Sequence, residues 1–449
     1  MGKLFGTDGV RGVANSELTP ELAYKLGKIG TYVLSKEKDR PVVLIGKDTR
    51  ISGDMLEDVI SAGVLSMGGN VIKVGVLPTP AIAYLVKHYK VDAGVVISAS
   101  HNTFEYNGIK FFNSEGFKLD DSIEDEIEDI VLRDIDVSSH ISGDKLGKCL
   151  KADDIALDHY ADYLKTTIDV DISGMKIVLD CANGAAYKIA EKVFKDLGAE
   201  VSVIANEPNG LNINEACGST HPETLQKLVV SKKADVGLAF DGDADRLIAV
   251  DELGRVVDGD KMMCICAKML KDCNQLKEGI VTATVMSNLG FHKAIKEMGG
   301  TVEVTAVGDR YVLESMLKTG SVIGGEQSGH MIFLDHATTG DGILSALQFV
   351  KAVKMSGKKV SELSDEITIF PQVLKNAKIK NENKKKYESD TEIKAEIERL
   401  EKLMAGEGRV LIRPSGTEPL VRVMIEGKDQ EVITGLAENL AKMLTEKFG

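Results

Sequence analysis

One sequence unit occurs three times along the chain, and it restricts the possible folds more than any other feature. Each copy reads as an apolar strand, a polar loop, a helix, a turn with glycine and a second apolar strand, and the copies occupy 41–75, 176–204 and 279–307. A further short apolar strand follows each copy. Apolar strands that alternate with helices are typical of largely parallel sheets covered on both faces. The pattern predicts three similar mixed α/β domains with largely parallel sheets.

The C-terminal part of the chain has a different pattern. A basic, polar stretch at 375–386 predicts a linker or an exposed edge. An amphipathic helix, two strands around the loop at 413–419 and a last amphipathic helix then predict a small α+β domain. A chain of 449 residues is too long for one hydrophobic core. We therefore predict four domains with boundaries near 150, 250 and 370, namely 1–150, 151–250, 251–370 and 371–449.

Charge and composition argue against several classes of partner. The net charge is −14, which disfavours nucleic acid or an anionic membrane as the main partner. The N-terminus has no signal-peptide segment, and no uninterrupted apolar run reaches the roughly 18 residues of a membrane span. The six cysteines form no CxxC pair, which is typical of reduced thiols. We expect a cytoplasmic protein without a nucleic-acid or membrane partner.

The segment "DGDADR" (241–246) directly follows an apolar strand and predicts a metal site. Asp241, Asp243 and Asp245 alternate, so an extended backbone places them on one face. Crowded carboxylates repel one another unless a cation lies among them, and hard oxygen ligands suit Mg²⁺ or Ca²⁺. An EF-hand loop is excluded because Arg246 stands where that loop needs glycine. An acidic surface turn is the simpler alternative.

The segment "SASHN" (98–102) ends another apolar strand on a serine beside a histidine. No G-x-S-x-G elbow surrounds Ser100, which argues against a Ser-His-Asp hydrolase. A phosphoryl group on this serine would add a charge of about −2. His101 and Lys110 could then stabilise charge or transfer protons. Taken alone, a serine and a histidine at a strand end more often form a cap or a turn.

Two further loops near strand ends carry polar side chains. "GGEQSGH" (324–330) brings together Glu326 and Ser328, which suit sugar hydroxyls, and His330, which suits acid/base work or a phosphate contact. "GTDGVRG" (6–12) places Arg11 between glycines, which allows close backbone approach. Lys47 and Arg50, in "GKDTR", have the pattern of ordinary surface charges, so Arg11 is preferred to them as a candidate site residue.

The loop "RPSGTEP" (413–419) has a composition that favours anion binding. Its backbone N–H groups, two hydroxyls and a guanidinium suit a phosphate group. A β-hairpin turn with incidental polar residues is the alternative. The residues concerned are Arg413, Ser415, Gly416 and Thr417, with Arg422 as a second cation.

Together these motifs resemble the α-D-phosphohexomutase family. "GTDGVRG", "SASHN", "DGDADR", "GEQSGH" and "RPSGTEP" occur in the family order and span essentially the whole chain. "GEQSGH", "TTGDG" (338–342) and "RPSGTEPLVRVMIE" are most similar to the bacterial phosphoglucosamine branch. One position departs from the family pattern: Thr103 stands where proline is usual. We expect a slightly looser loop there and retained activity.

The resemblance implies four domains around a central cleft and a role for each motif. Ser100 would carry the phosphoryl group, and one Mg²⁺ would be held by a phosphoserine oxygen and the three aspartates. Arg11, Lys110 and Arg246 would surround the transferred group, with Lys110 or His330 as acid/base. Glu326 and Ser328 would contact the sugar. The non-reacting phosphate would be held by Arg413, Ser415, Gly416 and Thr417.

The reaction that the resemblance implies is the interconversion of glucosamine 6-phosphate and glucosamine 1-phosphate. It would proceed through a phosphoserine enzyme and a sugar bisphosphate, and would feed nucleotide-amino-sugar and cell-wall precursor synthesis. A phosphomannomutase or phosphoglucomutase of the same fold is the runner-up. A non-catalytic phosphosugar-binding protein and a Mg²⁺ phosphatase are the alternatives from other classes. The resemblance also implies a homodimer.

Overall fold

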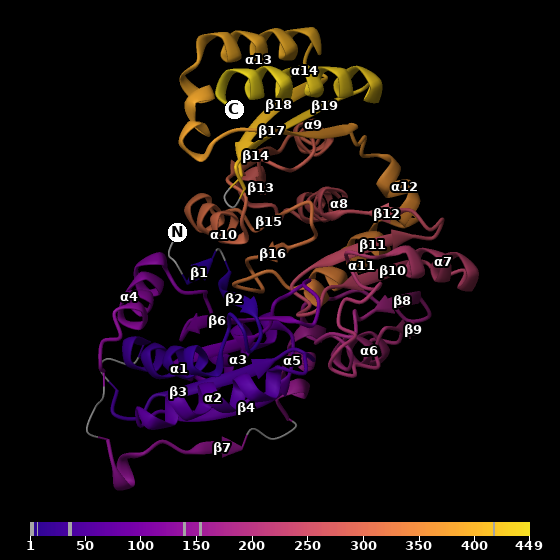
Figure 1. Cartoon of the computed structure of the whole chain (residues 1–449). Coiled ribbons are helices and arrows are strands. Elements are labelled where there is room, and N and C mark those ends of the chain that lie inside the picture. Colours follow the sequence, from indigo (N-terminus) through magenta and orange to yellow (C-terminus); the bar gives the residue numbers. More distant parts are fainter. Residues whose placement is uncertain (1–3, 7, 35–37, 138–140, 152–154, 416–417) are drawn as a thin grey trace. The chain divides into compact units, whose positions relative to one another are not determined.

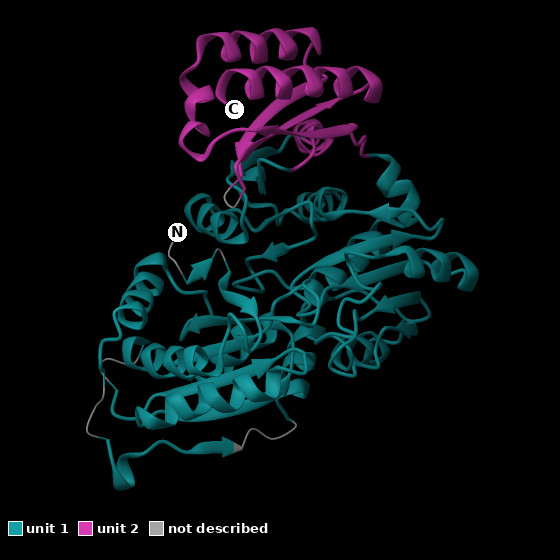
Figure 2. Ribbon diagram, viewed as in Figure 1, with its two compact units in different colours: residues 1–286, 299–366 teal, residues 287–298, 367–449 magenta. Residues whose placement is uncertain are grey.

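A computed structural model describes residues 4–6, 8–34, 38–137, 141–151, 155–415 and 418–449. The chain forms two compact units, shown in two colours in Figure 2. Unit 1 comprises residues 1–286 and 299–366, and unit 2 comprises residues 287–298 and 367–449. Among the described residues, no helix combines the length and the apolar character needed to cross a membrane.

Unit 1 begins with a seven-stranded sheet of order β1-β2-β6-β5-β3-β4-β7 (Figure 1). β3 pairs in parallel with β4 and β5, and β6 runs antiparallel to β5 and β2. The strands are β1 (Phe5–Gly6), β2 (Gly9–Val13), β3 (Val42–Lys47), β4 (Asn70–Val76), β5 (Ala93–Ile97), β6 (Tyr106–Asn113) and β7 (Cys149–Lys151). The helices are α1 (Pro20–Leu34), α2 (Gly53–Ser66), α3 (Thr79–Tyr89) and α4 (Asp121–Leu132), and a 3-10 turn spans Gly143–Lys145.

Two smaller sheets follow in unit 1, of orders β12-β11-β10-β8-β9 and β14-β13-β15-β16. The first contains β8 (Lys176–Asp180), β9 (Glu200–Ile204), β10 (Val236–Phe240), β11 (Leu247–Asp251) and β12 (Val256–Val257). The second contains β13 (Ile280–Thr284), β14 (Thr301–Thr305), β15 (Ile323–Gly325) and β16 (Met331–Phe333). The accompanying helices are α5 (Ile155–Thr166), α6 (Ile189–Asp196), α7 (Glu223–Lys232), α8 (Gly259–Asp272), α10 (Asp309–Thr319), α11 (Gly342–Ser356) and α12 (Val360–Asp365), with a 3-10 turn at Lys277–Gly279.

The three sheets share one strand order, as the repeated sequence unit predicts. The orders β6-β5-β3-β4, β11-β10-β8-β9 and β16-β15-β13-β14 are the same arrangement of three parallel strands and one antiparallel strand. The glycine in each repeated turn has a positive φ, at Gly68 (78°), Gly198 (86°) and Gly299 (78°). Glycine adopts this left-handed conformation without the penalty of a Cβ atom, so it ends each helix and returns the chain to the sheet. The predicted α/β architecture is confirmed, with mixed rather than purely parallel sheets.

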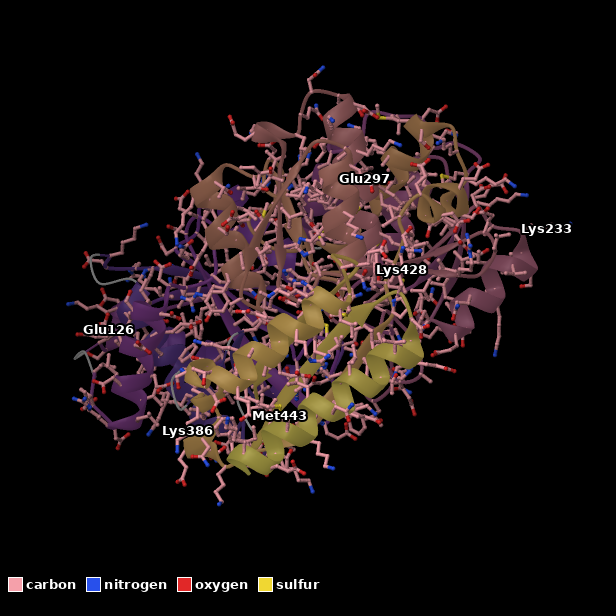
Figure 3. All side chains as sticks on the ribbon, turned by 90° about the horizontal axis from the view of Figure 1, so that it is seen from above. Glu126, Lys233, Glu297, Lys386, Lys428 and Met443 are labelled. Carbon is pink, nitrogen blue, oxygen red and sulfur yellow. The ribbon has the colours of Figure 1, made fainter. Side chains whose placement is uncertain are left out.

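Unit 2 contains a three-stranded antiparallel sheet of order β17-β19-β18. Its elements are α9 (Leu289–Glu297), β17 (Gln372–Lys378), α13 (Thr391–Leu403), β18 (Gly408–Pro414), β19 (Leu420–Gly427) and α14 (Gln430–Phe448), with 3-10 turns at Asn381–Asn383 and Lys386–Ser389. α13 and α14 lie side by side, and the labelled Met443 marks α14 in Figure 3. The basic stretch expected to be a linker or an edge provides the end of β17, an edge strand of this sheet.

Helices α13 and α14 of unit 2 begin at aspartate caps, and the cap of α9 is hydrogen-bonded to the segment before β17. Asp390 and Asp429 accept hydrogen bonds from N–H groups of the first turns of α13 and α14, which satisfies donors that have no partner inside the helix. Asn288, the cap of α9, donates from Nδ2 to the Phe370 carbonyl at 2.9 Å. A segment between β13 and β14 is thereby packed into the C-terminal unit.

Candidate active site

Three loops that follow the central strands of unit 1 meet at one place. The Ser100 hydroxyl, after β5, donates a hydrogen bond to Asp241 Oδ2, after β10, at 2.6 Å. Arg246 and His330, in the loops after β10 and β15, form a backbone bridge. The carboxyl ends of parallel strands lie at the same edge of a sheet, where ligands gather in α/β folds. The structure therefore brings together the serine, aspartate and histidine loops that the sequence singled out.

Ser100 is held by several hydrogen bonds in a strained backbone conformation. Its φ is 51°, and its side chain is buried. The Ser100 carbonyl accepts hydrogen bonds from Arg50 Nη2 at 3.0 Å and from Asn214 Nδ2 at 2.9 Å. The left-handed conformation costs a non-glycine residue about 1–3 kcal/mol, and such strain occurs mainly at functional sites. His101 lies beside it, with Nδ1 3.4 Å from the Ser100 hydroxyl.

Arg50 is part of this support, which the sequence did not indicate. The sequence favoured an ordinary surface charge, but the Arg50 side chain is fully buried, with Nε donating to Asp48 Oδ2 at 2.8 Å. Asp48 also accepts from the Ser98 hydroxyl at 2.5 Å, and the Ser98 hydroxyl in turn accepts from the Ser100 N–H at 3.0 Å. Asp48 and Arg50 thus connect the loop after β3 to the serine loop after β5.

Asp241, Asp243 and Asp245 form a buried carboxylate cluster. Of the described His, Cys, Asp and Glu side chains, these three can each offer one ligand atom within 4.8 Å of the others. Among the described residues, Oδ1 of Asp243 and Oδ1 of Asp245 have no hydrogen-bond partner. Burial and the two neighbouring carboxylates raise the pKa of Asp241 to about 8. Unpartnered carboxylate oxygens in a buried acidic cluster fit a hard divalent cation.

Lys110 and Arg11 place positive charge beside the cluster. Lys110 Nζ lies 2.9 Å from Asp243 Oδ2 and 2.7 Å from Asp8 Oδ2. Burial opposes the charged amine, but the two aspartates outweigh it and raise the pKa of Lys110. Arg11 is paired with Asp8 through Nη2. Arg246, the third predicted cation, has Nε 3.9 Å from Asp245 Oδ1. All three predicted cations therefore lie at the site, and Lys110 carries its proton at neutral pH.

The loop after β15 buries His330 inside the site and leaves Glu326 and Ser328 accessible to solvent. His330 is buried, with Nδ1 3.6 Å from Asp245 Oδ2, and its Nε2 accepts from the Gly340 N–H at 3.2 Å. Glu326 Oε1 accepts from the Gly308 N–H at 3.0 Å, and Glu326 Oε2 accepts from the Ser328 hydroxyl at 3.3 Å. Ser328 is exposed and Glu326 is half-buried, so both side chains can reach a polar ligand.

Two charged residues at the site had no sequence signal. Lys118, which follows β6, has Nζ 2.5 Å from Asp8 Oδ1 and 2.5 Å from Asp309 Oδ2. Asp309 is the first residue of α10. The two partners of Lys118 lie 110 and 191 residues away in the chain, so no local motif could reveal the pairing.

The candidate phosphate loop lies in unit 2, at the turn between β18 and β19. Arg413 and Arg422 are directly opposite partners in this antiparallel pair. Opposed residues project on the same face, and like charges there repel unless an anion lies between them. Ser415 is buried, and its hydroxyl accepts from the Glu418 N–H at 3.1 Å. The predicted contacts Gly416 and Thr417 lie outside the described residues.

Comparison with known families identifies the chain. Four family models match in order, described as phosphoglucomutase/phosphomannomutase alpha/beta/alpha domains I, II and III and C-terminal domain, at residues 2–137, 158–254, 258–370 and 374–443. The chain belongs to the phosphoglucomutase/phosphomannomutase family. Its four-domain architecture and its α/β fold class are those of this family.

Relatives within this phosphohexomutase family match over the full length. The chain is 58% identical to a protein named phosphoglucosamine mutase from Alkaliphilus oremlandii, with 100% of both chains covered. It is 59% identical to one of the same name from Thermoanaerobacter sp. strain X514, again over 100% of both. A family protein from Burkholderia thailandensis has the same fold, with a TM-score of 0.82 at 22% identity over 100% of this chain and 99% of that one.

One solved phosphohexomutase contains ligands of the expected kinds. Aspergillus fumigatus N-acetylphosphoglucosamine mutase was solved in complex with GlcNAc-6P and magnesium. It matches this chain with a TM-score of 0.70 at 18% identity, over 100% of this chain and 96% of that one. This likeness establishes the shared fold, and the buried aspartate cluster is compatible with a metal ion.

Proposed function

We propose that this phosphohexomutase interconverts glucosamine 6-phosphate and glucosamine 1-phosphate. The observation that carries the proposal is the position of the Ser100 hydroxyl, which donates a hydrogen bond to Asp241 of the buried aspartate triplet, beside the buried amine of Lys110. The name shared by relatives with 58–59% identity supports the choice of amino sugar. Such a product would feed UDP-N-acetylglucosamine and peptidoglycan precursor synthesis in the cytoplasm.

Ser100 is the residue that we propose to carry the phosphoryl group. Asp241, Asp243 and Asp245, with an oxygen of phosphorylated Ser100, would hold one Mg²⁺, which would neutralise phosphoryl charge. Lys110, Arg11 and Arg246 supply further positive charge around the Ser100 oxygen. Phosphoryl transfer depends mainly on such positioning and charge neutralisation, and the backbone support of Ser100 fixes the attacking or leaving oxygen.

The proposed reaction consists of two phosphoryl transfers. In the first, the bond from phosphorus to the Ser100 oxygen breaks, a bond from phosphorus to the free sugar hydroxyl forms, and the hydroxyl proton goes to a base. The serine oxygen is protonated, and the product is a sugar bisphosphate. After the bisphosphate reverses its orientation, Ser100 takes the other phosphoryl group. His330 and Lys110 are the acid/base candidates, and His101 is a further proton carrier.

The reversal requires a second phosphate site, for which the β18–β19 turn is the candidate. Arg413, Ser415, Gly416 and Thr417 would hold the non-reacting phosphate, with Arg422 as an additional cation. Glu326 and Ser328 would contact the sugar hydroxyls. We also propose domain boundaries near 150, 250 and 370 and a homodimer. The proposed partner is a small phosphosugar, with no nucleic acid or membrane involved.

Substrate preference and the Ser100→Ala variant test the proposal. Turnover should be highest on glucosamine 6-phosphate, and a preference for mannose 6-phosphate or glucose 6-phosphate would replace the amino sugar with one of these substrates. Ser100→Ala should lose mutase activity, and full activity in that variant would overturn the phosphoserine assignment. Release of free phosphate instead of isomerised sugar would indicate a phosphatase. Binding without turnover would indicate a phosphosugar-binding protein.

A further inference from the structure

Six side chains of unit 1 form a closed ring of ion pairs and close polar contacts at the candidate active site. Lys118 links Asp8 to Asp309, and Lys110 links Asp8 to Asp245, with Nζ 3.8 Å from Asp245 Oδ2. His330 closes the ring, with Nε2 3.5 Å from Asp309 Oδ2 and Nδ1 3.6 Å from Asp245 Oδ2. The charged ring therefore consists, in order, of Asp8, Lys118, Asp309, His330, Asp245 and Lys110.

The ring joins segments that are distant in the chain. Asp8 lies in the turn between β1 and β2, Lys118 follows β6, and Asp309 begins α10. Basic groups or the imidazole alternate with carboxylates around the ring, so each carboxylate has a partner on both sides. Burial opposes ionisation throughout, but the neighbouring partners lower the pKa of Asp309 and raise the pKa of Lys118. Neighbouring groups of opposite charge therefore compensate for the burial of the ring's members.

His330 is held in this ring by two long contacts. Its contacts with Asp245 and Asp309 are both longer than 3.4 Å, and Nε2 also accepts from the Gly340 N–H at 3.2 Å. Lys118 and His330 are the two groups that lower the pKa of Asp309. If Lys118 lost its charge, Asp309 would keep its contact with the imidazole, which attracts the carboxylate when the ring is protonated. The imidazole would then be drawn toward Asp309 and away from Asp245.

We infer that Lys118 and Asp309 are positioning residues, which fix His330 and Lys110 relative to Ser100 by closing the charged ring. Lys118 neutralises Asp309, so His330 stays beside Asp245. Lys118 also shares Asp8 with Lys110, so the amine of Lys110 remains directed at Asp243. Replacing a buried ion pair by apolar groups of similar volume is often neutral for stability, so stability alone does not account for this ring. The inference rests on the proposed mutase activity.

Steady-state kinetics of Lys118→Met, Asp309→Asn and the double variant test the inference. Lys118→Met should lower kcat by about 100-fold, because a displacement of about 1 Å at a reacting group has that effect, while KM stays near that of the unchanged protein. Asp309→Asn should be milder because it leaves no unpaired carboxylate. The double variant should recover about tenfold of the Lys118→Met loss, because the attraction that displaces His330 is gone. Lys118→Arg should lose less than Lys118→Met.

Lys351→Met is the matched control. Lys351 is also largely buried and paired with one aspartate, with Nζ 2.7 Å from Asp169 Oδ1, but it lies outside the charged ring. It should change the melting temperature without changing kcat.

Several outcomes would overturn the inference. Lys118→Met with unchanged kcat but a lower melting temperature would show a merely structural role. A rise in KM alone would make Lys118 a substrate-binding residue. A double variant that is as impaired as the product of the two single effects would exclude coupling through the ring. If Lys118→Met does not fold, Asp309→Asn and Lys118→Arg still decide between these roles. Absence of mutase activity in the unchanged protein would instead refute the proposed function.

Discussion

Replacing Arg50 by methionine should damage both the stability of the protein and the position of Ser100. The Arg50 side chain makes four hydrogen bonds, to Asp48 Oδ2 and to the carbonyls of Ser100, Asn102 and Thr103. Its removal leaves the fully buried Asp48 carboxylate without its cation and three carbonyls with fewer donors. Burial already raises the pKa of Asp48, against the influence of Arg50.

The expected magnitude follows from the burial of the pair. Neither side chain of the Arg50–Asp48 pair is exposed, and breaking such a pair by removing one partner costs about 3–5 kcal/mol. A shift of about 1 Å in the released Ser100 carbonyl would lower kcat by about 100-fold. Urea unfolding followed by circular dichroism measures the first effect, and steady-state mutase kinetics measure the second.

Two comparison variants separate the causes. In the double variant Arg50→Met with Asp48→Asn, no unpaired charge remains, so most of the stability should return while kcat stays low. Lys73→Met removes a surface pair, with Nζ 2.5 Å from Asp58 Oδ1, and should cost about 0–1 kcal/mol. An Arg50→Met protein with unchanged stability and unchanged kcat would refute the reasoning.

Three further predictions follow from the site. Burial and its neighbours raise the pKa of Asp241 to about 8, and a carboxylate must lose its proton to bind metal. Mg²⁺ affinity, measured by titration calorimetry, should therefore rise with pH by up to about tenfold per pH unit below pH 8. Affinity that falls as the pH rises would contradict this. In Gly340→Ala the added Cβ would lie 2.3 Å from His330 Nε2. The imidazole would have to move, so kcat should fall about tenfold or more. Gly435→Ala is the control: its added Cβ has no atom within 4 Å, and kcat should stay unchanged. Arg413→Met should raise KM for the phosphosugar by about tenfold or more, because a charged hydrogen bond to the phosphate is lost. A tenfold fall in kcat with unchanged KM would contradict the proposal that Arg413 binds the non-reacting phosphate.

Much of the fold could be predicted from the sequence, because local signals repeat. Glycine turns such as those at Gly68 and Gly198 end a helix by the same conformation in each copy, and the apolar strands on either side have the same order in each sheet. Periodicity does not specify strand pairing, however. The antiparallel strands β6, β11 and β16 had to be seen in the structure, and so did the packing of α9 into unit 2.

The site could be predicted only where chemistry is concentrated in short motifs. The alternating aspartates 241–245 and the serine loop were evident because their residue types are unusual directly after a buried strand. Lys118 and Asp309 were missed because each has an ordinary sequence context and is significant only through its distant partners. Arg50 was underestimated for a related reason. Burial of an arginine depends on the tertiary acceptors around it, here Asp48 and the carbonyl of Ser100.

The most direct test of the account is to locate a phosphoryl group on the protein. The unchanged protein and Ser100→Ala would each be incubated with Mg²⁺ and a hexose 1,6-bisphosphate, and analysed by intact mass and by mapping of the peptide that spans residues 95–110. The account predicts that the unchanged protein gains one phosphoryl group, removable by phosphatase and located on Ser100, and that the variant gains none. Equal labelling of Ser100→Ala, or a phosphoryl group on another residue, would contradict it.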